Sequence, residues 1–339
     1  MDKNLSYILI ETTIRNTIKK IKEDPERNVR NLVDLALFFS EGRFQRRFFQ
    51  TAQTMLKNEN SSYYKLIPDI ITNVNTERIV SFGMNVGYNS CTIGANTIRE
   101  IEASEHFNIP WCITLDLDGN DYRRNPSVYH SLISQGKELG IYVWIIHSLR
   151  NPHYMIDLMC RFPDCAFLLL CTPDEITPAL LKNCETVYNI MFAVKYKDSA
   201  DSACALLRSG NHLYSVYSDG MDSNENNLNE LLCDTENLHA SFTFILSDPK
   251  DNFSLSDIHH TILQARAEQN HCTIPFALLQ DSYFIDSIIS EYADFLLFDV
   301  NGNCYSLNNN TLFKNCNFKH DSLRDILKRI PHHTQQEIP

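Results

Sequence analysis

Residues 111–147 read WCITLDLDGNDYRRNPSVYHSLISQGKELGIYVWIIH. The apolar runs at the two ends of this stretch enclose a segment that carries the signals of a helix. Asn125 and Pro126 suit the N-cap and the first helical position, and Gly140 suits the left-handed residue that ends a helix. A strand, a helix and a second strand in this order predict one βαβ unit of an α/β protein, with both strands buried in a parallel sheet.

Similar short apolar runs recur along the chain, with helical stretches between them. Residues 172–175, TPDE, form another helix start, a capping box with proline at the first helical position. The fold class predicted is α/β, a (β/α) partial TIM-type barrel of about 6–8 parallel strands whose working face is the carboxyl end of the strands. The runs expected to be strands are 79–86, 111–117, 141–147, 166–171, 188–194, 213–218, 241–247 and 295–300.

The pattern divides the chain into four expected segments. Residues 1–75 contain no strand-like run and predict an N-terminal helical layer. The strand and helix rhythm then predicts a barrel over 76–290 and a short C-terminal extension over 291–330. The last residues, 331–339, read PHHTQQEIP and predict a frayed tail.

Composition narrows the classes of function. Lys and Arg number 30 against 42 Asp and Glu, so the net charge of −12 disfavours nucleic acid and anionic membranes as partners. Glycine occurs 10 times, and the chain contains no glycine-rich phosphate motif. The 11 cysteines include no C-x-x-C pair, and the first residues lack the apolar segment of a signal peptide. We therefore expect a cytoplasmic protein with reduced thiols.

Two stretches at the ends of consecutive expected strands carry a resemblance. Residues 90–98, SCTIGANTI, follow the run at 79–86, and residues 119–126, GNDYRRNP, follow the run at 111–117. Together they resemble the radical SAM family. In that family the first strand ends in a loop with three cysteines spaced C-x3-C-x2-C. The second strand ends in Gly-Gly-Glu-Pro, followed by a helix and by a strand that "ELGI-V" introduces.

Matched residue by residue, Cys91 stands at the first cluster cysteine, while Ala95 and Ile98 stand at the second and the third. The family's [4Fe–4S] cluster needs three thiolates, which leave one iron open to SAM. The resemblance therefore implies a degenerate member in which Cys91 is a remnant and no iron–sulfur cluster is expected. A distant thiol such as Cys171, at the end of its strand, is the remaining source of unusual ligation.

The second stretch keeps more of the family pattern. Gly119, Asn120 and Asp121 fall on the Gly-Gly-Glu positions, with the acid shortened by one carbon. The resemblance implies that these three residues contact SAM. A structural explanation is also open for each site: Gly119 turning the chain, Asp121 favoured by a helix start, and Cys91 as a small buried residue.

The C-terminal part resembles the SPASM-like end of peptide-modifying members, with the pattern G-x-V-Y-P-C … G-N-I … S-L-x-x-I. Residues 301–307 read NGNCYSL, and 317–318 and 321–327 continue the pattern. Leu307 stands where the pattern has a ligand cysteine. The resemblance implies a peptide or a partner enzyme as the binding partner.

Acidic residues near the end of the expected strand 111–117 are the candidates for catalysis. Asp116 and Asp118 flank Leu117, and strand alternation sends both to one face, with Asp121 close behind. We expect a cluster-less, radical-SAM-like binding or accessory protein that holds a ligand or a peptide at the barrel mouth. Two alternatives are an enzyme with non-radical chemistry that uses these acids, and an active SAM-dependent enzyme with unusual cluster ligation.

Overall fold

One ten-stranded sheet organises the chain in the computed structural model, which describes residues 5–21, 25–38, 40, 43–219, 225–246, 255–290, 295–307 and 311–331. The strand order is β10-β9-β8-β1-β2-β3-β4-β5-β6-β7. Strands β1 to β7 are parallel, β8 is parallel to β1, and β9 and β10 are antiparallel. The α/β prediction is confirmed, and the sheet is an open, partial (β/α) barrel with β7 and β10 at its edges. The bounds are β1 (Cys112–Asp118), β2 (Val143–Arg150), β3 (Ala166–Cys171), β4 (Ile190–Lys195), β5 (Tyr214–Asp219), β6 (Phe242–Leu246), β7 (Ile274–Ala277), β8 (Leu296–Phe298), β9 (Asn303–Ser306) and β10 (Thr311–Asn317).

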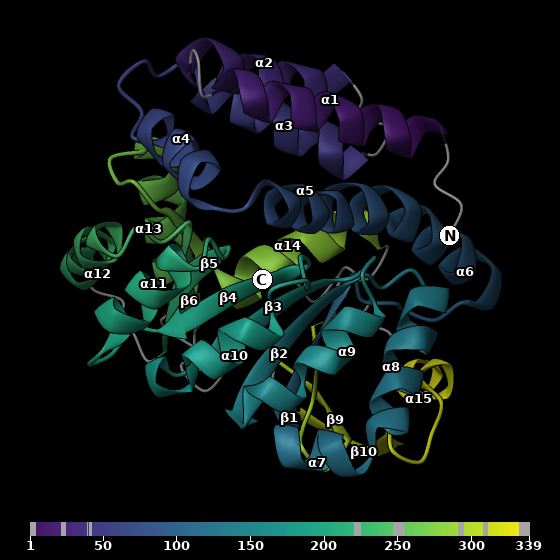
Figure 1. Ribbon diagram of the computed structural model, residues 1–339. Helices are drawn as coiled ribbons and strands as arrows, with labels where there is room; N and C mark the ends of the chain where they lie inside the picture. Colours follow the sequence, from purple (N-terminus) through teal and green to yellow (C-terminus); the bar gives the residue numbers. More distant parts are fainter. Residues whose placement is uncertain are drawn as a thin grey trace.

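Helices cover the sheet and connect its strands (Figure 1). The layer before the sheet contains α1 (Leu5–Ile21), α2 (Pro25–Phe38), α3 (Arg43–Met55), α4 (Tyr63–Asn73), α5 (Thr76–Met84), the π-helix η1 (Asn85–Gly94) and α6 (Ala95–Glu105). The connections are α7 (Gly119–Arg124), α8 (Pro126–Glu138), η2 (Pro152–Tyr154), α9 (Ile156–Arg161), η3 (Pro173–Glu175), α10 (Pro178–Asn183), α11 (Ala200–Ser209), α12 (Glu225–Asn237), α13 (Leu255–Glu268), α14 (Leu278–Ile289) and α15 (Leu323–Arg329).

The βαβ unit predicted from residues 111–147 is present as β1, α8 and β2. Asn125 is the N-cap of α8, Pro126 is its first residue, and Gly140 has φ +94° after its end. The helix lies very close to the sheet, because a Cβ at Gly136 would come within 2.4 Å of the Trp144 ring. Burial of that ring against the helix fixes how α8 crosses the two strands.

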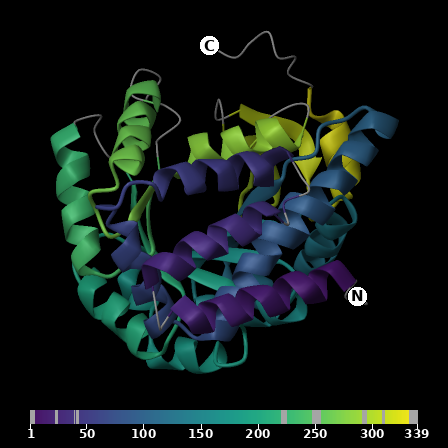
Figure 2. The same ribbon diagram turned by 90° about the horizontal axis from the view of Figure 1, so that it is seen from above.

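The helical layer has a core of its own. Figures 1 and 2 show α1, α2 and α3 lying over α5, on the side away from the sheet. Ile18, Ile21, Val29, Val80 and Met84 are buried together between these helices. The expected N-terminal helical layer is therefore present in the described residues.

The expected strand at 79–86 is wrong, because these residues form the end of α5 and the start of η1. Asn75 caps α5 by accepting a hydrogen bond from the backbone of Glu77 (2.8 Å). Val80 and Met84, four residues apart, then face the core of the helical layer. A short apolar run fits either period, and here the cap and the partner helices decide for the helix.

Strand β8 pairs in parallel with β1. It lies beside β1, where the resemblance predicts the strand 79–86. The expected extension therefore continues the same sheet through β9 and β10. Strand β7 was not expected, because it has only four residues and one of them is Pro275. Of the tail expected at 331–339, residues 332–339 lie outside the described residues.

Candidate functional site

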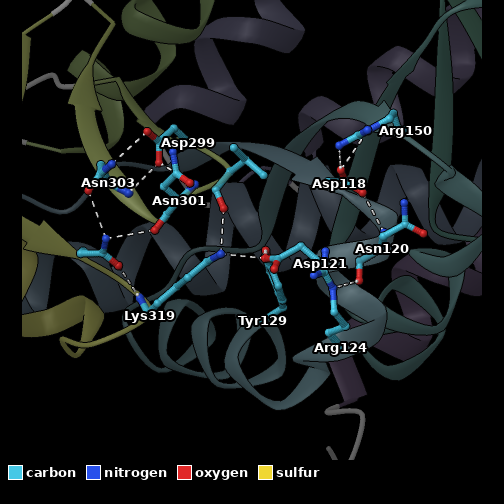
Figure 3. A network of polar contacts seen from close by, with 12 residues as sticks. Asp118, Asn120, Asp121, Arg124, Tyr129, Arg150, Asp299, Asn301, Asn303 and Lys319 are labelled. Atoms are coloured by element: carbon cyan, nitrogen blue, oxygen red, sulfur yellow. Dashed lines mark hydrogen bonds and ion pairs between the residues drawn. The ribbon is translucent and has the colours of Figure 1, made fainter.

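The carboxyl end of β1 begins a network of polar contacts (Figure 3). Asp118 ends the strand in an extended conformation and accepts the backbone N–H of Asn120 (2.8 Å), so that it caps α7. Its second oxygen accepts hydrogen bonds from Arg150 of β2, at 3.0 Å from Nε and 2.6 Å from the second guanidinium nitrogen. Burial raises the pKa of Asp118, but these hydrogen bonds outweigh it and leave the pKa below the usual value. Asp118 is thus an ionised anchor between two strands and a helix.

Asp121 has two partners, and both contact its Oδ2. It accepts a hydrogen bond from the Tyr129 hydroxyl (2.5 Å) and forms an ion pair with Lys319 (2.7 Å). Burial raises the pKa of Asp121, but the hydrogen bonds from Lys319 and Tyr129 and the charge of Lys319 lower it by more. The net result is a pKa below the usual value. The pKa of Tyr129 is raised by burial and by the negative charge of Asp121. A ligand that contacts this carboxylate has to share it with Lys319.

The backbone at Gly119 has a packing role. A Cβ at this position would lie 2.1 Å from the carbonyl oxygen of Asn151, in the loop after β2. The neighbouring Asn120 donates its backbone N–H to Asp118, and its carbonyl accepts a hydrogen bond from Nε of Arg124 (3.1 Å). The contacts in the structure therefore support the structural explanation for this glycine.

Lys319 is held in position by a turn of the C-terminal segment. Asp299 accepts the backbone N–H groups of Asn301 (2.9 Å) and Asn303 (2.8 Å). The side chain of Asn317 bonds to the carbonyl of Asn301 (3.0 Å) and accepts the N–H of Lys319 (2.9 Å). Figure 3 shows the Lys319 side chain extending from this turn to Asp121. The polar residues at 301–303 and 317–319 thus fasten the C-terminal segment to the end of β1.

Asp116 belongs to a different pair. It lies opposite His147 of β2, and its Oδ1 is 3.0 Å from the Nδ1 of that ring. The side chains are 27% and 43% exposed, so both are accessible to a ligand. The register between β1 and β2 shifts after Leu117. Asp118 therefore lies opposite Arg150, and Leu149 of β2 is skipped. Each of the two expected carboxylates is therefore paired with a different basic residue of β2.

Further ion pairs continue along the carboxyl ends of the strands. Lys195 of β4 pairs with Asp219 of β5 (2.5 Å), with side chains 30% and 53% exposed. Glu175 accepts a hydrogen bond from Ser148 (2.7 Å) and completes the expected capping box with Thr172. The carboxyl edge of the barrel thus presents acids and bases already paired.

Cys91 lies at the other end of the sheet. It is buried in η1, and burial raises the pKa of its thiol to about 12. Asn85 and Asn89 of the same helix donate to the carbonyls of Cys165 (2.8 Å) and Asp164 (3.0 Å), just before β3 begins. The helix therefore crosses the amino ends of the strands. The expectation that Cys91 occupies a loop after a strand is wrong, because a helix has formed there.

The residues present do not fit a three-cysteine cluster. Ala95 and Ile98 offer no donor atom, and both are buried. Cys171 ends β3 as expected, but η1 contacts the opposite end of that strand, so it cannot join Cys91. Across the described parts of the chain, no group of three or more His, Cys, Asp and Glu side chains is arranged to hold a metal ion.

Sequence analysis did not identify His147 or Lys319. His147 ends the quoted run IYVWIIH, and a polar residue at the end of a buried strand was the available signal. Lys319 had no such signal, because its partner lies 198 residues away.

No helix in the described ranges is both long and apolar enough to cross a lipid bilayer.

Comparisons with known proteins find structural similarity at low sequence identity. No protein-family profile and no curated protein matches this chain. The chain is similar to Streptococcus suis SuiB bound to S-adenosylmethionine, with TM-score 0.48 and 10% identity over 67% of this chain and 66% of that chain. SuiB bound to the precursor peptide SuiA gives TM-score 0.47 and 9% identity, covering 67% of each chain. A further SuiB structure gives TM-score 0.47 and 11% identity over 88% of this chain and 81% of that one.

Proposed function

We propose that this protein binds a peptide or a small ligand at the carboxyl edge of the barrel and does so without an iron–sulfur cluster, as a binding or accessory protein. One observation carries the proposal: the segment matched to the cluster loop is a buried helix at the amino ends of the strands. Its single thiol has a pKa raised to about 12, while iron needs thiolate ligands. The accessible polar groups lie at the opposite end.

The spacing of those groups favours an extended peptide. The Asp116–His147 pair lies on β1 and β2, and the Lys195–Asp219 pair lies on β4 and β5. The two pairs are three strand spacings apart, about 14 Å along the sheet. An extended peptide covers that distance with about four residues. Each pair offers both a donor and an acceptor, which suits the main chain and the mixed charges of a peptide.

Peptide binding can be tested with a pool of random-sequence octapeptides retained on the immobilised protein and identified by mass spectrometry. We expect His147→Ala and Lys195→Ala each to reduce retention about tenfold, the equivalent of ~1.4 kcal/mol. Lys182→Ala, an exposed lysine of α10, is the matched control and should retain the wild-type pool. Equal retention by all four proteins, or none by the wild type, would overturn the proposal.

SAM, the ligand that the sequence resemblance implies, would have to compete with Lys319 for the carboxylate of Asp121. The Lys319 ammonium already pairs with this carboxylate and also donates to the carbonyl of Val300 (2.8 Å). A cationic amino group that approached Asp121 would compete with it. If SAM binds there, Lys319→Ala should increase the rise in Tm that SAM produces, whereas an unchanged rise would place any SAM elsewhere.

A second candidate function is acid–base catalysis by Asp116 and His147. An exposed imidazole whose Nδ1 is hydrogen-bonded to a carboxylate is oriented for proton transfer at its other nitrogen. Asp118 and Asp121 no longer support this function, because each is committed to a basic partner. A panel of p-nitrophenyl esters and phosphates tests the candidate, which requires activity in the wild type that His147→Gln and Asp116→Asn both reduce. No rate above background would remove it.

A further inference from the structure

A cavity of about 110 Å³ lies within the helical layer. It is remote from the carboxyl edge of the barrel, because η1 contacts the amino ends of the strands. Helices α1, α2 and α3 supply one wall, and α5 with η1 supplies the other. Its apolar lining includes Ile10, Ile14, Leu32, Leu35, Phe49 and Met84.

Two glycines leave this space open. Gly83 and Gly87 line the cavity four residues apart, and among the described residues a Cβ at either would meet no atom within 4 Å. At other positions a close contact explains why the residue is glycine. A Cβ would lie 2.2 Å from a backbone oxygen at Gly94 and 2.1 Å from one at Gly119. Glycine inside a helix is destabilising relative to alanine. In the described part of the chain, no packing contact requires glycine at these two positions, which weaken the helix and leave a volume unfilled.

The wall that carries them is also unusual in its geometry. Gly87 lies in η1, a π-helix of 10 residues. π-helices are rare, are mostly confined to a single turn, and are frequent at functional sites. The cavity and the π-helix coincide along Gly87, Tyr88 and Thr92.

Four of the lining residues, Thr13, Ser40, Tyr88 and Thr92, carry a hydroxyl group, and the other nine are apolar residues or glycines. The Ser40 hydroxyl donates to the carbonyl of Leu37 (2.6 Å), and Tyr88 packs edge-on against Tyr7. A buried water needs two to four polar partners, whereas apolar cavities of about 150 Å³ stay dry and bind benzene or xenon. We propose that this cavity binds a hydrocarbon group of about the size of benzene, as part of a small apolar ligand.

The test uses benzene as the probe and the full chain as the protein. We expect saturating benzene to raise the Tm of the wild type by about 2 °C, with one site per chain by calorimetry. The Gly83→Ala/Gly87→Ala variant should fold, because each added methyl enters open space and alanine favours the helix. Its Tm should start higher, and benzene should no longer raise it.

Leu312→Ala, which removes an exposed apolar side chain of β10, is the matched control and should respond to benzene as the wild type does. Phenol should raise the Tm less than benzene does, because its hydroxyl has to leave water to enter a mostly apolar lining. The proposal is overturned if benzene leaves the wild type unchanged, or if it raises the Tm of the double alanine variant equally. Neither result depends on what the barrel edge binds.

Discussion

Lys319 and Asp121 are 198 residues apart in sequence, and their charged groups lie 2.7 Å from each other at the end of β1. The pair joins the C-terminal segment to the barrel, with about a fifth of each side chain exposed. The same lysine donates to the carbonyl of Val300, so it links three separate parts of the chain. The pair also occupies the carboxylate that the sequence analysis assigned to SAM.

Replacing Lys319 should destabilise the fold. Lys319→Ala leaves a half-buried Asp121 with Tyr129 as its remaining side-chain partner, so we expect the free energy of unfolding to fall by about 1–2 kcal/mol. Lys314→Ala, an exposed lysine of β10, should change it by less than about 0.5 kcal/mol. Urea unfolding measures both. Equal effects would mean that the pair contributes nothing specific.

Two glycine positions should respond in opposite directions to the same substitution. Gly119→Ala forces a Cβ to within 2.1 Å of the Asn151 carbonyl, so we expect a loss of about 1–3 kcal/mol. The added methyl of Gly87→Ala meets no described atom within 4 Å, so this substitution should be neutral or stabilising. Thermal unfolding compares them directly. A tolerated Gly119→Ala would contradict the close contact between α7 and the loop after β2.

The stability of the protein should fall in acid because of His212. Burial lowers the pKa of His212 to about 3, with the nearby charge of Arg78 as a second cause. The unfolded chain, with a pKa near 6.5, therefore takes up the proton first, and stability is lost as the pH falls below that value. We expect a slope of up to about 1.4 kcal/mol per pH unit between pH 6 and pH 4.

The matched variant for this slope is His212→Gln, which cannot be protonated in this range. Unfolding by urea at several pH values should give it a shallower dependence than the wild type. The same slope in both proteins would place the responsible group elsewhere.

The cysteines should differ in reactivity according to their burial. Cys160 and Cys233 are exposed, whereas burial raises the pKa of Cys91 to about 12. In native protein, iodoacetamide should label the first two and leave Cys91 unmodified until denaturant is added. Peptide mapping by mass spectrometry reads out each site. Rapid labelling of Cys91 would mean that η1 is open to solvent.

The sequence predicted most of the sheet, because each buried parallel strand carries a continuous apolar run between helix signals. The stretch from β1 to β2 is the best case, since Asn125, Pro126 and Gly140 mark both ends of α8. The run at 79–86 failed because its apolar residues fit a helix as well as a strand. The partner helices that decided the outcome are distant in sequence.

The candidate site was predicted only in part. The position of Asp116 at the end of β1 followed from the strand, but the register shift that skips Leu149 of β2 places Asp118 opposite Arg150, whereas Asp116 pairs with His147. His147 and Lys319 became visible only through strand register and a contact between distant segments. Patterns within a short window do not contain that information.

The segment around Cys91 is expected to hold no iron–sulfur cluster. Iron and sulfide should be measured per chain after anaerobic reconstitution, in the wild type and in Cys91→Ala. We predict less than about one iron per chain in both, because one buried thiol with neighbours Ala95 and Ile98 cannot supply three ligands. About four irons per chain in the wild type, lost in Cys91→Ala, would contradict the account.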